Sequence, residues 1–147
     1  MLLVACLGIR PAASQVGVEL DPVVVGLPVV DIGHAGDGSE RLVLATTDGM
    51  LWVVEDGQLA PQPWLDLSDR VVCCGESGFA AFAFHPEFPT RDEVFVLYTR
   101  VGPQLAQAKD SVLSRIRLAA DGSGRFDPAT EVILLRIPEP ASNHNAN

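Results

Sequence analysis

The stretch that decides the fold is His34-Ala35-Gly36-Asp37-Gly38-Ser39-Glu40-Arg41-Leu42-Val43-Leu44-Ala45-Thr46-Thr47, because a second segment follows the same plan. That segment is His85-Pro86-Glu87-Phe88, followed after a slightly longer loop by Glu93-Val94-Phe95-Val96-Leu97-Tyr98-Thr99. Each consists of an apolar strand, a histidine, a polar turn and a strand that ends in threonine. The two histidines are 51 residues apart, and the threonines Thr47 and Thr99 are 52 apart. Such an interval is typical of the four-stranded units that repeat around a β-propeller.

The rest of the chain also favours strands. Its apolar segments are short, rich in Val, Leu and Phe, and separated by turn residues, and none has long helical periodicity. The pattern predicts an all-β chain with strands near 29–33, 41–47, 50–55, 63–67, 79–84, 93–99, 111–118 and 131–137. Asp48-Gly49 predicts a hairpin with a two-residue turn, since Asp-Gly meets the demand for positive φ at both central positions. Asp37-Gly38, Asp56-Gly57 and Asp121-Gly122 predict three further turns.

The predicted strands supply about two blades, whereas a closed propeller needs at least about four. An open pair would leave strand edges and an apolar blade face unpartnered. The sequence stops at Asn147, after a loop and where a third inner strand would begin. We therefore expect residues 16–147 to be the amino-terminal part of a larger propeller. Residues 23–25, all valine, are expected to form a strand that pairs with its last blade.

Composition excludes several classes of protein. The chain has 147 residues, 48% of them hydrophobic, and a net charge of −9. This apolar content suits a packed core, and no apolar run reaches the ~20 residues that a membrane-spanning helix needs. The acidic balance and the lack of a basic cluster argue against a nucleic-acid partner.

The amino terminus resembles part of an export signal. Residues 1–8 are apolar, and Pro11-Ala12-Ala13-Ser14 resembles the small-residue end of such a signal, although the charged first region is absent. We expect residues 1–15 to be an export segment and the protein to be periplasmic or secreted. Leu3-Val4-Ala5-Cys6 also resembles a lipoprotein box, which gives lipidation of Cys6 as an alternative.

Cys73-Cys74 has no zinc-ligand spacing and no partner pair elsewhere in the sequence, so no metal site is expected. Two interpretations stay open. The cysteines form a vicinal disulfide in an oxidising compartment, or they are reduced thiols in a loop, which is the simpler interpretation.

Two loops are candidates for chemistry, because each leads into an inner strand and so opens at one mouth of the channel. The first, residues 73–78, contains Glu76, and the second, residues 140–145, contains His144. Glu76 and His144 occupy matching positions in consecutive blades. Both side chains would therefore point to the same mouth of the channel, where they could act as an acid/base pair. Each also has a structural interpretation: Glu76 bonds neighbouring loop amides, and His144 is an ordinary polar loop residue. His34 and His85 follow inner strands and are expected to bond loop carbonyls.

Familiar catalytic motifs are missing. Gly75-Glu76-Ser77-Gly78 resembles a nucleophile elbow, but Phe79 stands where that motif requires glycine. The sequence also has no phosphate-binding Gly-Lys loop, no Rossmann glycine fingerprint and no His-x-x-x-His pair.

Residues 75–88, Gly-Glu-Ser-Gly-Phe-Ala-Ala-Phe-Ala-Phe-His-Pro-Glu-Phe, resemble the Gly-Glu/Gln-x-Gly-Leu-Leu-Gly-hydrophobic-Ala-Phe-His-Pro-Asp-Phe segment of the glucose/sorbosone dehydrogenase family. Residues 142–145, Ser-Asn-His-Asn, resemble its Asn-His-Asn-Gly-Gly motif, and residues 34–42 resemble the start of its first blade. The resemblance covers most of residues 26–147. It implies a six-bladed propeller that oxidises a sugar with pyrroloquinoline quinone (PQQ) and Ca²⁺, and that passes electrons to an acceptor.

The resemblance also implies roles for single residues. His144 stands where the family's general base removes the proton of the anomeric hydroxyl, while hydride passes to PQQ. Glu76 stands where a Gln or Glu reaches the substrate, and Asn143 where an Asp can touch the sugar. The residues that bind the cofactor and Ca²⁺ lie further along the family's chain, so we expect them beyond Asn147 and expect this chain alone to be inactive.

The sequence departs from the family at two points. Ala146-Asn147 replace the Gly-Gly of the His motif, and Ala80-Ala81 replace Leu and Gly. These departures sustain a rival hypothesis, in which the propeller binds carbohydrate or a protein partner without redox chemistry, as animal hedgehog-interacting proteins of the family do. Glu76 and His144 favour the enzyme. The sugar, the electron acceptor and the oligomeric state are not encoded in these motifs.

Overall fold

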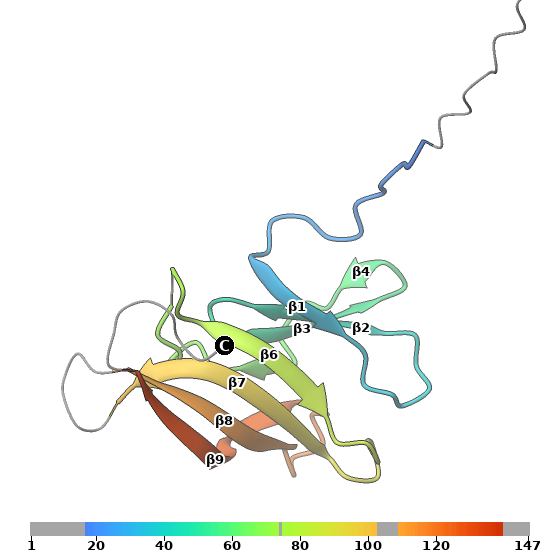
Figure 1. Ribbon diagram of the computed structural model, residues 1–147. Helices are drawn as coiled ribbons and strands as arrows, with labels where there is room; N and C mark the ends of the chain where they lie inside the picture. Colours follow the sequence, from blue (N-terminus) through green and yellow to red (C-terminus); the bar gives the residue numbers. More distant parts are fainter. Residues whose placement is uncertain (1–16, 74, 103–108, 140–147) are drawn as a thin grey trace, which may run out of the picture.

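The computed structural model describes residues 17–73, 75–102 and 109–139, and these form two antiparallel sheets (Figure 1). The first contains β1 (Val29–Gly33), β2 (Leu42–Thr46) and β3 (Met50–Glu55), with the short strands β4 (Gln58–Leu59) and β5 (Leu65–Asp66) both paired to β3. The second contains β6 (Phe79–Phe84), β7 (Glu93–Val101), β8 (Lys109–Leu118) and β9 (Phe126–Glu139). The described residues include no helix, and hence none that could cross a membrane.

Each sheet is one blade of a propeller-type fold, which confirms the predicted fold class. Within a sheet the strands follow one another in chain order, as in a meander, and β4 and β5 together form the outer edge of blade 1. The blades lie face to face, with β1 against β6 and β5 against β9. Inner strand thus meets inner strand and outer meets outer, which is the arrangement of consecutive blades.

All eight predicted strands are present, and those at 29–33, 50–55 and 79–84 have the predicted bounds. The prediction missed β4 and placed the start of β9 five residues late, at residue 131 instead of Phe126. Asp127 and Pro128 have the composition of a turn, but here they lie at irregularities in the β8–β9 pairing. Pairing with β8 overrides the local preference.

The internal repeat is visible in backbone hydrogen bonds. Thr47 N donates to Pro28 O, just before β1, over 3.0 Å, and Thr99 N donates to Gly78 O, just before β6, over 2.8 Å. Phe79 N in turn donates to Thr47 O over 3.0 Å, so that the first blade anchors the start of the second.

The hairpin prediction was wrong in one detail. Thr46 pairs with Met50, so residues 47–49 form a three-residue loop in which Gly49 has a φ of 102°. Two consecutive positive φ values occur instead at Asp56 (51°) and Gly57 (73°), where Glu55 pairs with Gln58. The two-residue turn assigned to Asp48-Gly49 is therefore found at the next Asp-Gly pair along the chain.

The core fills the space between the blades. Fully buried aliphatic side chains from β2 and β3 face those of β7 and β8. Near the outer strands, Trp64 packs between Phe84 and Phe126, with ring centroids 5.3 and 5.2 Å apart, and its Nε1 donates to Gly124 O over 2.6 Å. One aromatic side chain of blade 1 thus contacts both edge strands of blade 2, β6 through Phe84 and β9 through Phe126.

The outward faces of the two blades carry exposed apolar side chains, as expected of an open pair. On blade 1, Ile32 is 62% and Leu42 39% exposed, and on blade 2, Leu135 is 51% exposed. Residues 23–25 form no strand here, and Val25 is 80% exposed. The strand expected to pair with them belongs to a blade other than the two described, so that prediction stays open.

Candidate functional site

The loop between β5 and β6 ends at a tightly fixed point. Gly78 has a φ of 149°, and a Cβ added to it would lie 2.7 Å from Thr47 Cγ2 and 2.8 Å from Thr47 O. Only glycine fits so close to the neighbouring blade. The preceding residue, Ser77, is only 3% exposed. The loop is therefore held firmly one and two residues after Glu76.

Glu76 itself is exposed and lines a pocket of about 210 Å³. The lining residues come from both blades: Val30, Thr47, Gly75, Glu76, Ser77, Gly78, Phe79 and Ala80. The pocket lies where β6 begins and β2 ends, which is the end of the blades at which the sequence predicted a mouth. The structure thus brings Glu76 to a hollow at the predicted end.

Charged residues of β8 and β9 lie at the same end of the blades. Lys109 Nζ donates to Ser77 Oγ over 2.8 Å, and Arg136 Nη1 donates to Asp110 Oδ2 over 2.5 Å. Sequence reasoning missed Lys109, because 32 residues separate it from Ser77. In the sequence, the only feature that could have drawn attention to Lys109 is the charged pair Lys109-Asp110 just before the strand predicted at 111–118. Lys109 gives the loop that carries Glu76 a positive neighbour.

A partly buried polar cluster joins the loop between β5 and β6 to blade 2. Arg70 Nη1 donates to Pro128 O and to Glu131 Oε2, each over 2.7 Å. Tyr98 and Ser114 donate to Glu131 Oε1 over 2.6 and 2.7 Å. Burial opposes ionisation of Glu131, but these hydrogen bonds outweigh it and hold the pKa of Glu131 below its ordinary 4.5. The carboxylate therefore stays charged and ties the loop to blade 2.

The same hydrogen bond changes the pKa of Tyr98 in the opposite direction. Burial first, and the hydrogen bond to the Glu131 carboxylate second, raise the pKa of Tyr98 well above its ordinary 10. Its hydroxyl thus remains a proton donor to Glu131 and is not a base at neutral pH.

The other sequence-predicted residues fall in different places. His144 and Asn143 lie outside the described residues. His34 and His85 lie at the far end of the inner strands from Glu76, where Nδ1 of each accepts a backbone N–H two residues on, over 3.2 and 3.0 Å. They stabilise turns, as expected, but by accepting amide hydrogen atoms, whereas carbonyl partners had been predicted.

Cys73 is disulfide-bonded, so the interpretation as reduced thiols does not hold for this residue. The chain's other two cysteines, Cys6 and Cys74, lie outside the described residues. Cys73 is exposed and precedes Glu76 by three residues. One half of the disulfide thus lies in the loop that carries Glu76.

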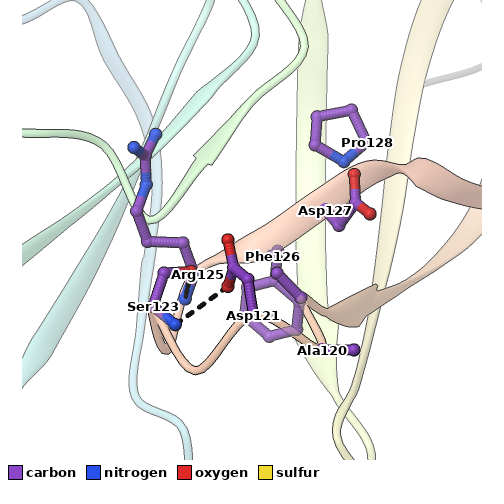
Figure 2. A pocket seen from close by; sticks show the side chains of 8 residues that line it. Ala120, Asp121, Ser123, Arg125, Phe126, Asp127 and Pro128 are labelled. Atoms are coloured by element: carbon purple, nitrogen blue, oxygen red, sulfur yellow. Dashed lines mark hydrogen bonds between the residues drawn. The ribbon is translucent and has the colours of Figure 1, made fainter.

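A larger hollow, of about 550 Å³, lies at the opposite end of blade 2, in the loop between β8 and β9 (Figure 2). There Asp121 Oδ1 accepts the Ser123 N–H over 2.9 Å, and this backbone hydrogen bond lowers the pKa of Asp121. Arg125 points away to Gln62, to which its Nη1 donates over 2.9 Å. Arg125 Nε, by contrast, is buried without a hydrogen-bond partner among the described residues. The hollow lies away from the pocket beside Glu76 and adds nothing to it.

Residues that could hold a metal or PQQ are scarce in the described part of the chain. There, no three His, Cys, Asp or Glu side chains gather to form a metal site. Of the cations at this end of the blades, Lys109 donates to Ser77, Arg136 donates to Asp110, and Arg100 lies on β7 in register with Asp110. The described residues therefore do not form a Ca²⁺ site by themselves.

No family model matches the chain, but it is similar in sequence to two curated proteins and in structure to a solved protein. The Hedgehog-interacting proteins of Mus musculus and Homo sapiens are 33% and 32% identical to it over 72 residues. These matches cover 45% of this chain and 10% of each relative, so the matched part spans about a tenth of their length.

A solved structure from Thermus thermophilus, described as an oxidoreductase (glucose dehydrogenase), is similar with a TM-score of 0.62. The sequences are 24% identical, and the likeness covers 79% of this chain and 31% of that one. The fold is therefore glucose dehydrogenase-like, and the two blades correspond to about a third of that molecule.

Proposed function

We propose that this chain is part of a propeller enzyme that oxidises a sugar hydroxyl, with the mouth beside Glu76 as the sugar site. The observation that carries the proposal is the position of Glu76, exposed on a firmly held loop over a pocket between the blades. The glucose dehydrogenase-like fold and the sequence motifs support it. A sugar and an electron acceptor are the proposed partners.

The proposed roles follow from side-chain chemistry. The carboxylate of Glu76 accepts a hydrogen bond from a sugar hydroxyl, and Asn143 orients the same sugar through its amide. His144 accepts the proton of the anomeric hydroxyl, as an imidazole can near neutral pH. By family resemblance PQQ, with Ca²⁺, would supply the hydride acceptor. Its binding groups would have to come from residues other than those described here.

The proposed location is the periplasm or the exterior of the cell. The disulfide at Cys73 supports it, because disulfides persist in oxidising compartments. The export-like character of residues 1–15 agrees with this location, with lipidation at Cys6 as the alternative.

The likeness to Hedgehog-interacting proteins favours a second candidate function, a binding module without redox chemistry. In this case the mouth would bind a carbohydrate or a protein partner, and His144 would have no proton to remove.

Dye-linked sugar oxidation by the complete protein, supplied with PQQ and Ca²⁺, distinguishes the two functions. His144→Ala should lower turnover by at least ~100-fold, which is the usual scale for loss of a general base. Glu76→Ala should raise the KM for the sugar. His34→Ala is the matched control and should leave turnover unchanged, since His34 lies at the other end of the blades.

Wild-type turnover in His144→Ala would contradict the enzyme proposal, and an unchanged KM in Glu76→Ala would return Glu76 to a structural role. No turnover at all, together with partner binding that His144→Ala leaves intact, would favour the binding module.

A further inference from the structure

The hairpin of β7 and β8 in blade 2 extends further than its counterpart in blade 1. In blade 1 the pairing of β2 with β3 ends at Thr46 and Met50. Tyr98 takes the place of Thr46 in blade 2, since each pairs with the first residue of an inner strand. Beyond Tyr98, however, the pairing of β7 with β8 continues for three residue pairs, which we call the hairpin extension. These pairs are Thr99–Ser111, Arg100–Asp110 and Val101–Lys109.

The hairpin extension is supported by a third strand. β9 continues beside it, so that Ser111 pairs with Ile137 and Lys109 with Glu139. Three paired strands form a far more stable structure than a hairpin alone. The extension lies at the same end of the blades as Glu76, and it can therefore hold the neighbouring loop in place.

The first pair of the extension binds the backbone of the Glu76 loop at two points. The carbonyl oxygen of Thr99 accepts the N–H of Val72 over 2.8 Å, and the N–H of Thr99 donates to Gly78 O over 2.8 Å. In blade 1 the corresponding Thr47 donates to Pro28 O through both its N–H and its Oγ1, over 3.0 and 3.1 Å. Blade 2 thus uses one residue of the extension to fix the loop on both sides of Glu76.

The last pair of the extension binds a side chain within the same loop. Lys109 lies on β8, and its side chain reaches past β7 to donate from Nζ to Ser77 Oγ over 2.8 Å. Ser77 is only 3% exposed, whereas Glu76, directly before it, is exposed. Hydrogen bonds from a charged donor are stronger than those between neutral groups. Lys109 therefore fixes the residue next to Glu76, which the backbone hydrogen bonds at Val72 and Gly78 do not reach.

We propose that Lys109 is a positioning residue for the mouth: by holding Ser77 it keeps Glu76 over the pocket between the blades and so strengthens ligand binding there. Both Glu76 and Ser77 line this pocket, so a displacement of Ser77 changes its shape directly. A loop that is already ordered also loses less conformational freedom when a ligand binds. Where the ligand is a sugar, this inference rests on the proposed function.

Hydrogen exchange of residues 75–78 in the complete protein tests the structural part of the inference, whatever the function. Lys109→Met removes the donor and keeps an unbranched side chain. Exchange in this loop should become at least ~10-fold faster, which is the scale for losing a hydrogen bond to a charged group. Exchange within β7 and β8 should not change, which checks that the fold is intact.

Ser77→Ala shows whether Lys109 acts through Ser77. It removes the same hydrogen bond from the other side and should accelerate exchange to a similar extent. The double variant should exchange no faster than the faster single variant, because both substitutions remove one contact. If Lys109→Met does not fold, Ser77→Ala takes its place in all measurements.

Steady-state kinetics of sugar oxidation tests the functional part. Lys109→Met should raise the KM for the sugar by at least ~10-fold and leave kcat within about twofold, as expected when binding alone is weakened. Lys109→Arg retains a cationic donor and should keep most of the wild-type affinity. Arg100→Met is the matched control for charge. Arg100 belongs to the neighbouring pair of the extension and points to its opposite face, so its removal should leave KM unchanged.

Three results would overturn the inference. Unchanged exchange in Lys109→Met would show that the contact with Ser77 does not hold the loop. Faster exchange with an unchanged KM would show that the position of the loop does not govern affinity. Equal rises in KM in Lys109→Met and Arg100→Met would assign the effect to charge instead of position.

The failure of the proposed function would look different. A complete protein that oxidises no sugar would contradict the enzyme proposal, while the exchange measurement would still decide whether Lys109 holds the loop. The Kd for a carbohydrate or protein partner would then replace KM, with the same expected rise in Lys109→Met and the same control.

Discussion

The two blades share a strand order but differ in what fills them. In blade 1 most buried side chains are aliphatic, such as Val43, Leu51 and Val54, and among the described residues of its strands the buried polar side chain is the neutral Thr46. Blade 2 buries charged groups as well: Glu93 is 3% and Asp110 4% exposed. The repeat thus preserves the path of the backbone and leaves the chemistry of the interior free to change.

The buried carboxylate of Glu93 in blade 2 has three cationic partners. Arg117 donates to Glu93 Oε1 over 2.7 Å, Arg115 lies 3.6 Å from the same oxygen, and Arg91 lies 4.0 Å from Oε2. The hydrogen bond from Arg117 lowers the pKa of Glu93, so this carboxylate stays charged. Blade 2 therefore depends on the ionisation of its side chains, whereas blade 1 depends on apolar packing.

The largest expected effect comes from the aromatic side chain that joins the blades. Trp64→Ala removes the ring between Phe84 and Phe126 and the hydrogen bond to Gly124 O. We expect the free energy of unfolding to fall by about 4 kcal/mol, as for other buried aromatic residues. Urea unfolding measures it. Trp52→Ala is the control, because Trp52 is only half-buried on an outward face, and an equal loss there would contradict the argument.

Glu131→Gln tests whether blade 2 relies on charge. The amide can still accept from Tyr98 and Ser114, but Arg70 loses its close counter-charge and keeps only the exposed Asp69, 3.7 Å from its Nε. We expect a loss of about 2 kcal/mol in the free energy of unfolding. The exposed Glu55 on β3 of blade 1 gives the matched control, and Glu55→Gln should change stability by less than about 0.5 kcal/mol.

The same carboxylate predicts a pH dependence. The pKa of Glu131 is lower in the folded chain than its ordinary 4.5, so its stabilising contribution is complete above that value and is lost as the pH falls below it. The pKa of Tyr98 is raised above 10, so its contribution is lost as the pH rises past 10. Unfolding at about pH 3, 7 and 10.5 should show both losses. Glu131→Gln should weaken both, and an unchanged profile would contradict the cluster's role.

A smaller difference in stability is expected between alanine substitutions in two turns of blade 1, at Gly57 and at Gly49. Gly57→Ala costs about 1 kcal/mol, because φ is 73° but nothing lies within 4 Å of the new Cβ. Gly49→Ala places Cβ 2.7 Å from Val71 Cγ2 and 3.1 Å from the Leu67 backbone, and should cost at least about 1 kcal/mol more. Thermal unfolding of both variants gives the difference. Equal losses would show that Val71 and Leu67 move aside freely.

The sequence predicted which end of the blades the Glu76 loop would occupy. Glu76 could be placed at the mouth because a loop leading into an inner strand opens there in any propeller, and the structure places it beside a pocket at that end. The contact of Lys109 with Ser77 and the Arg70–Glu131 pair could not be predicted, since each joins residues that are far apart in the chain. The roles of Glu76, His144 and Asn143 stay predictions.

The sequence alone determined the all-β class, the number of blades and nearly every strand, because alternating apolar runs and Asp-Gly turns act locally and repeat. It could not decide which Asp-Gly pair forms the two-residue turn, since strand register fixes the loop length at Asp48-Gly49. Nor could it show which side chains meet between the blades, because Trp64, Glu131 and Phe82 acquire their neighbours only when one sheet packs on another. Pairing between distant segments is a property of the whole fold, and only the tertiary structure determines it.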